Sequence, residues 1–155
     1  MKSKQVKILS QPINTVELHY KRPLIEKLVH ITSADEADTY IRRHINSQRI
    51  DLKEFFWVVL LSNANQALGF AEIGSGTNKG IRVSIREIFQ LALISNASGI
   101  IIAHNHPSGK LTSSLNDKAL TGKIEKIAST LSIKLVDHLI ITSESYYSFK
   151  DGGLL

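Results

Sequence analysis

Residues 99–117 read GIIIAHNHPSGKLTSSLND, and this stretch carries the clearest indications of the fold. Its first part, Ile100–Ala103, is short, apolar and mostly β-branched, which predicts a strand that is buried on both faces. Pro107 and Gly109 predict a turn in the loop that follows. A helix is then expected from about Ser114 to Leu131. The stretch therefore predicts a strand–loop–helix unit.

Periodic patterns on either side of this unit predict the remaining strands and helices. Strands are expected at Phe55–Leu61, Leu68–Ile73, Ile133–Thr142 and Tyr146–Phe149, and helices are expected after the capping serines Ser33 and Ser84. The first helix is expected to continue to about Gln48, and Gly99 is expected to stop the second. Strands that alternate with helices predict an α/β domain, and a hairpin through residues 63–66 makes the predicted sheet mixed, with helices flanking it.

The length of 155 residues matches the ordinary size of one domain. We expect an N-terminal arm at residues 1–15 and a single domain at residues 16–155. At the start of this domain, Val16, Leu18 and Tyr20 alternate with polar residues as in a half-buried strand. Such a strand could pair with its own sheet or with a neighbouring molecule, so the sequence leaves the oligomeric state open.

Hydropathy argues against a membrane protein and a secreted protein. The longest strongly apolar run, Phe55–Leu61, is far shorter than the ~20 residues that cross a bilayer. The first residues lack the apolar core of a signal peptide. We therefore expect a cytoplasmic protein with no membrane partner.

Composition restricts the chemistry of the chain. It contains no cysteine, six histidines and 14 acidic residues, so disulfides, thiolate metal sites and a cysteine nucleophile are excluded. The net charge is +5, and residues 1–53 carry most of it, with ten Lys or Arg against six Asp or Glu. A basic balance permits contact with nucleic acid. No run of basic residues interleaved with aromatics accompanies it, and this favours a solvated basic surface.

Two histidines stand where the central strand is expected to end. His104 and His106 are separated by one residue, so in an extended chain both imidazoles point to the same side and can reach one metal ion. Asp117 follows in the first turn of the expected helix. Three such ligands with one open position describe a catalytic zinc site. Ser114-x-x-Asp117 also fits a capping box, and the spacing alone leaves the ligand and cap roles of Asp117 open.

The same residues resemble a known motif. His-x-His followed by Ser114-x-x-Asp117 resembles the JAMM motif of the MPN-domain metalloproteases, and HNHPSG at residues 104–109 resembles the RadC branch of that superfamily in particular. The resemblance covers about residues 15–155. Further segments that resemble RadC proteins lie at residues 84–89, 135–141 and 147–153. The resemblance implies an MPN/JAMM domain, whose α-β-α architecture is similar to that of cytidine deaminases.

This resemblance implies a zinc-dependent peptidase or isopeptidase. His104, His106 and Asp117 would hold Zn²⁺. The upstream glutamate of the family motif corresponds to Glu54, which would take a proton from the attacking water and deliver it to the leaving amine. Ser114 would donate a hydrogen bond to the developing oxyanion.

Glu72 competes with Glu54 for the role of general base. Between residues 55 and 103 the acidic residues are Glu72 and Glu87, and helix capping explains Glu87. Glu72 falls inside an expected strand. The order of the strands in the family motif favours Glu54.

Structural explanations suffice for the other four histidines, which are His19, His30, His44 and His138. His104 and His106 need acceptors on their second ring nitrogens, and the sequence does not identify these acceptors. Asp137 and His138 face opposite ways on an alternating strand, so at most one of them points toward the site. Both are interpreted as structural residues.

A different class of function is also open, because superfamilies contain non-catalytic members and a fold does not fix function. The family's association with DNA repair supplies no mechanism. The domain could bind DNA, or a repair or replication partner, through its basic first third, with the metal only structural. A nuclease that uses the same metal is a further alternative, because the residue types suit both reactions. The sequence does not name a substrate.

Overall fold

The computed structural model describes residues 20–21, 23–24, 27–76 and 81–155. The expected arm at residues 1–15 lies outside these residues, and so does the expected strand at residues 16–20 apart from Tyr20. None of the helices in the described ranges is long and apolar enough to cross a membrane.

The described residues form one five-stranded sheet in the order β2-β1-β3-β4-β5. The strands are β1 (Phe55–Leu61), β2 (Ala67–Ser75), β3 (Gly99–Asn105), β4 (Lys134–Ile141) and β5 (Tyr146–Ser148), and the helices are α1 (Ala34–Arg42), the short 3₁₀ helix η2 (Ser47–Arg49), α2 (Ile85–Ile94) and α3 (Leu115–Thr130). β3 and β4 run parallel, whereas the other neighbouring strands run antiparallel. The predicted α/β fold with a mixed sheet is confirmed.

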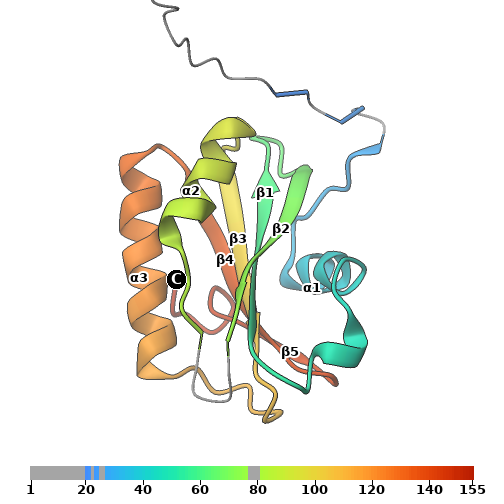
Figure 1. The fold of residues 1–155 in the computed structure, drawn as a ribbon. Coiled ribbons are helices and arrows are strands. Elements are labelled where there is room, and N and C mark those ends of the chain that lie inside the picture. The colour runs from blue at the N-terminus through green and yellow to red at the C-terminus, as the bar shows by residue number, and fades with distance from the viewer. Residues whose placement is uncertain (1–19, 22, 25–26, 77–80) are drawn as a thin grey trace, which may run out of the picture.

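Helices cover both faces of the sheet (Figure 1). α2 and α3 pack on one face, called the α2/α3 face below, and α1 packs on the other, called the α1 face. The central strand β3 contributes to both cores, because Ile100 and Ile102 point to the α2/α3 face while Ile101 and Ala103 point to the α1 face. All four are at most 2% exposed, which confirms that the strand is buried on both sides.

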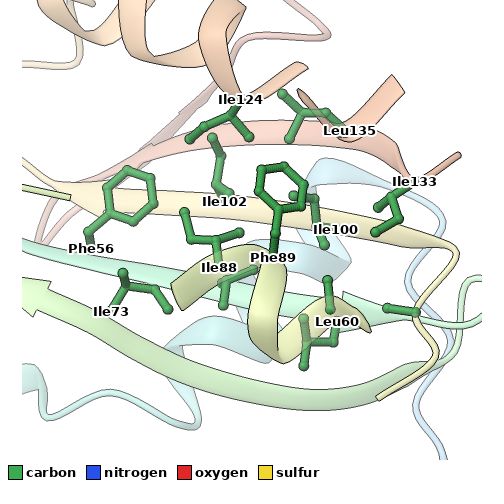
Figure 2. Close-up of a cluster of buried hydrophobic side chains, with 14 of the residues drawn as sticks. Phe56, Leu60, Ile73, Ile88, Phe89, Ile100, Ile102, Ile124, Ile133 and Leu135 are labelled. Carbon is green, nitrogen blue, oxygen red and sulfur yellow. The ribbon is translucent and has the colours of Figure 1, made fainter. Parts of the chain in front are cut away.

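The core on the α2/α3 face extends to the edge of the candidate site (Figure 2). Ile88 and Phe89 of α2 and Ile124 of α3 pack against the sheet. Phe56 of β1 lies toward one end of this cluster and stacks on the His104 ring, with 6.2 Å between the ring centroids. The same apolar packing that stabilises the sheet therefore orients one imidazole of the site.

Serine side chains begin all three α-helices at the predicted positions. Ser33, Ser84 and Ser114 each accept a hydrogen bond from the backbone N–H three residues later. The first helix ends at Arg42, before the predicted end at Gln48. The side chain of Asn46 accepts a 3.0 Å hydrogen bond from the N–H of Gln48, which favours a separate 3₁₀ turn over continuation of the helix.

The prediction that Gly99 stops the second helix is wrong. α2 ends at Ile94, and the residue with left-handed backbone after it is Asn96, whose φ is 53°. Gly99 instead begins β3. A Cβ there would lie 3.1 Å from Cγ2 of Val136, so glycine permits the close approach of β3 and β4.

A β-bulge interrupts the pairing of β3 with β4. Ile100 pairs with Leu135, but Ile101 pairs with Asp137, so Val136 is the extra residue. Val136 and Asp137 both lie on the α1 face, where Val136 packs with the core and Asp137 lines a small pocket beside α1. From His138 onward the alternation resumes with the opposite phase.

Candidate metal centre

The two histidines of the motif lie at the end of the central strand. β3 continues through His104 and Asn105, past its predicted end at Ala103, because His104 pairs with both β1 and β4 and Asn105 pairs with β4. His106 follows at once, and its N–H donates to the carbonyl of Ile141 at 3.0 Å. The Nε2 atoms of His104 and His106 lie 3.0 Å apart.

Asp117 approaches these nitrogens from the first turn of α3. Its Oδ1 lies 3.3 Å from Nε2 of His104, and its Oδ2 lies 3.7 Å from Nε2 of His106. Oδ2 also accepts a 2.7 Å hydrogen bond from the N–H of Ser114, whose hydroxyl accepts one from the N–H of Asp117. The capping role and the approach to the histidines, which the spacing left as alternatives, therefore coexist in one carboxylate.

The second ring nitrogens of both histidines have partners. Nδ1 of His106 lies 2.7 Å from the carbonyl of Lys110, which can only accept, so His106 carries its proton on Nδ1 and a lone pair on Nε2. Nδ1 of His104 lies 2.8 Å from Nε2 of His138. Two imidazole nitrogens and a carboxylate thus converge on one point, and this donor set fits a metal cation.

Burial and charge shift the titration of the same groups. Burial by itself raises the pKa of the Asp117 carboxyl, but the two imidazoles beside it, which stabilise the carboxylate when they carry a proton, and the hydrogen bond from Ser114 outweigh burial and hold this pKa well below its usual range. The hydrogen bond to Asp117 raises the pKa of His106 against the opposing effect of burial. Burial lowers the pKa of His138 well below its usual value, so that ring is neutral.

A pocket of about 600 Å³ opens beside the three donors. It is lined by Glu54, Phe56, Ile81, Arg82, His104, His106, Ser114, Asn116, Asp117 and Leu120. Glu54 directly precedes β1, and its negative charge contributes to the raised pKa of His106. The structure therefore brings all five residues of the motif to one pocket.

Glu72 lies elsewhere. It pairs with Trp57 across β1 and β2, and both residues line a separate pocket on the α1 face together with His44. The sheet separates this pocket from the His104 side of the molecule. Glu87 lies in the first turn of α2, where its N–H donates to the capping hydroxyl of Ser84, and it does not line the pocket beside the histidines.

The sequence interpretation missed three residues of the site. Asn105 is fully buried between the two histidines, and its side chain bonds to the backbone on both sides of Glu54. His138 and Thr121 lie behind His104 as successive hydrogen-bond partners. Alternation along β3 could have placed Asn105 on the opposite face from the histidines. The bulge in β4 hides the orientation of His138 from any pattern of period two.

Comparison with known families agrees with this geometry. A model of the RadC-like JAB domain matches residues 31–154. The chain belongs to this family. The resemblance to RadC proteins drawn from the motif residues is thereby confirmed, and so is the fold that it implied.

Curated RadC-family relatives carry uninformative names. A UPF0758 protein of Flavobacterium johnsoniae is 42% identical over 130 residues, which cover 84% of this chain and 56% of the relative. One of Fusobacterium nucleatum is 37% identical, with coverage of 90% and 59%. UPF0758 protein YkfG of Escherichia coli strain K12 is 37% identical, with coverage of 86% and 83%. The chain thus spans less than two thirds of the first two relatives and most of YkfG.

Proposed function

We propose that this RadC-family chain is a zinc-dependent hydrolase that cleaves peptide or isopeptide bonds. The observation that supports this function is the convergence of His104, His106 and Asp117 at a pocket that Glu54 and Ser114 also line. Metal-assisted hydrolysis of an amide bond requires metal ligands, a proton acceptor and a hydrogen-bond donor, and these residues offer all three kinds of group.

The donor set suits zinc. In a tetrahedral site with Zn–N bonds of about 2.0–2.1 Å, neighbouring ligand atoms lie about 3.3 Å apart. Here the two Nε2 atoms lie 3.0 Å apart, and Asp117 approaches them with different oxygens, Oδ1 at 3.3 Å from His104 and Oδ2 at 3.7 Å from His106. One ligand atom from each of the three residues lies within 4.8 Å of the other two. Three protein ligands leave a fourth position open, as in catalytic zinc sites. When bound, zinc acts as a Lewis acid and brings the pKa of a coordinated water close to neutrality.

Glu54 and Ser114 have distinct roles in this proposal. Glu54 accepts a proton from the attacking water and passes it to the leaving amine. The hydroxyl of Ser114 already accepts a 3.1 Å hydrogen bond from the N–H of Asp117, so its own hydrogen is free to point into the pocket. Ser114 donates that hydrogen to the oxyanion that develops at the substrate carbonyl.

Matched glutamate variants test the proposal. Glu54→Gln should retain zinc and lose turnover of a peptide or isopeptide substrate, whereas Glu72→Gln, on the α1 face, should retain both. The measurements are zinc content after purification without added metal and cleavage of a panel of peptide, isopeptide and nucleic-acid substrates. A protein that binds no zinc at neutral pH would contradict the proposal.

The panel also separates the alternatives. Cleavage of nucleic acid that depends on Glu54 would indicate a nuclease instead. Binding to DNA that weakens steeply with salt, without cleavage of any substrate, would indicate a binding module with a structural metal.

A further inference from the structure

A buried imidazole lies directly behind the candidate metal centre. Nε2 of His138, on β4, lies 2.8 Å from Nδ1 of His104, on β3. Nδ1 of His138 lies 2.6 Å from the hydroxyl of Thr121, on α3. His138 is 0% exposed, and Thr121 and His104 are each 3% exposed. Three separate elements thus contribute to one chain of contacts.

The last contact of this chain fixes the direction of every hydrogen bond in it. The Thr121 hydroxyl lies 2.6 Å from the backbone carbonyl of Asp117, and a carbonyl can only accept. Thr121 therefore donates its single hydrogen to that carbonyl and accepts from Nδ1–H of His138. His138 is 0% exposed and its ring nitrogens face His104 and Thr121, neither of which is a carboxylate that could balance a buried charge. The ring therefore carries one hydrogen, on Nδ1, and the lone pair on its Nε2 accepts from Nδ1–H of His104.

Aromatic packing holds the His138 ring in this orientation. Phe149 stacks on it with 4.4 Å between ring centroids and an interplanar angle of 23°. Phe56 contacts it from another side with 6.0 Å between centroids. The ring therefore presents the same two nitrogens to His104 and Thr121.

We propose that Thr121 and His138 are positioning residues that fix the tautomer of His104, so that its Nε2 always presents a lone pair to the metal. This inference rests on the proposed function and extends it to the residues behind the ligands. The opposite tautomer would place a hydrogen on Nε2, where the metal ligand atom is required. Because this series of hydrogen bonds ends on the backbone carbonyl of Asp117, it also connects His104 on β3 with the backbone of Asp117 on α3.

We call the hydrogen bonds from His104 through His138 to Thr121 the relay. A pair of Thr121 variants tests it by measuring metal affinity. Thr121→Val removes the hydroxyl at nearly constant volume, and Thr121→Ser keeps it. We expect Thr121→Val to bind Zn²⁺ about 10–100-fold more weakly than wild type, as measured by competition with a chromophoric chelator. Thr121→Ser should bind within a few-fold of wild type. Equal affinity of the valine variant and wild type would overturn the relay.

Tautomers of the metal-free wild-type protein give a second measurement that needs no variant. Long-range ¹H–¹⁵N NMR spectra should show the Nδ1–H form of both His104 and His138 at a pH where both rings are neutral. An Nε2–H form of His138 would contradict the relay. This readout also separates the two proposals. If the wild-type protein shows both Nδ1–H forms but binds no zinc, the relay geometry is supported and the proposed hydrolase function is contradicted.

Discussion

The side-chain carbonyl of Asn105 accepts a 2.6 Å hydrogen bond from the backbone N–H of Phe55, the residue that follows Glu54. The amide of the same side chain donates to the carbonyl of Lys53, which precedes Glu54, at 2.8 Å. It donates also to the carbonyl of Ile50 at 2.6 Å. The strand position between the two candidate ligands therefore holds the backbone on either side of the candidate base. Successive side chains of an extended strand point to opposite faces, so the histidines face the candidate metal centre while Asn105 holds the backbone around Glu54.

We expect Asn105→Ala to destabilise the protein and to lower turnover more than zinc content. Each buried backbone group that loses its partner costs about 1–3 kcal/mol, and the Phe55 N–H and two carbonyls would lose theirs. Denaturant unfolding measures the stability, and zinc content and substrate cleavage measure the site. Asn63→Ala, in the exposed turn between β1 and β2, is the matched control and should change stability by no more than about 0.5 kcal/mol. Unchanged stability of Asn105→Ala would contradict this role of Asn105.

Three substitutions separate the capping role of Ser114 from the oxyanion role that we propose for it. Ser114→Ala should lose about 1 kcal/mol of stability with the helix cap, whereas Ser114→Gly should lose only a few tenths. Both should reduce turnover by about 10²–10³-fold if the hydroxyl stabilises the oxyanion, with zinc still bound. Ser114→Thr keeps the hydroxyl and should retain stability and turnover. Turnover that follows stability across the three variants would indicate a capping role alone.

The raised pKa of His106 predicts a pH dependence of metal binding. In the metal-free protein, Asp117 holds this pKa above the ordinary value of about 6.5. As the pH falls through the raised pKa, the ring gains a proton on the metal-binding nitrogen, and zinc affinity should fall about tenfold per pH unit from this group. Chelator competition at several pH values measures the trend. Asp117→Asn should lower the pKa of His106 in an NMR titration, and an unchanged pKa would contradict the assigned cause.

The stability of the metal-free protein should follow the same group. Because the folded-state pKa of His106 exceeds its unfolded value, protonated His106 stabilises the fold below about pH 6.5. This contribution is lost as the pH rises through the raised folded-state pKa. Denaturant midpoints at pH 6 and pH 9, compared for wild type and His106→Gln, should show a smaller difference in the variant. An identical difference in both proteins would assign the pH effect to other groups.

Core packing beside the site predicts a large effect at Ile102. Its side chain is 0% exposed and packs between β3 and the helices of the α2/α3 face. Ile102→Ala should lower the free energy of unfolding by about 2–5 kcal/mol, from lost burial and the cavity that remains. Leu115 at the start of α3 is 85% exposed, so Leu115→Ala should change the free energy of unfolding by less than about 0.5 kcal/mol. Thermal or denaturant unfolding measures both, and similar values for the two variants would contradict the packing.

Local patterns were sufficient to predict most of the fold. The apolar run of β1 coincides with its predicted range, and serine caps begin all three α-helices where expected. These signals succeeded because caps and buried strands depend on neighbouring residues. Gly99 failed as a helix stop because its role is set by Val136 on another strand. A contact between distant segments leaves no local pattern.

The candidate site divides in the same way. His104, His106 and Asp117 lie within one strand–loop–helix unit, so their spacing was enough to group them. Glu54 required the family motif, because only the pairing of β1 with β3 brings it near. The sequence showed that at most one of Asp137 and His138 faces the site, and it gave no means to choose between them.

Val136, the extra residue of the bulge in β4, determines that His138 and not Asp137 faces the candidate site. Without Val136 as a bulge, regular alternation from Leu135 would turn Asp137 toward Thr121 and send His138 to the opposite side of the sheet. A carboxylate, which can only accept when ionised, would then lie behind His104 in place of a ring that passes a hydrogen bond onward. The length of β4, counted to a single residue, thus decides the chemical character of the wall behind the metal centre. Deletions and insertions in this strand would act there before they affected any ligand.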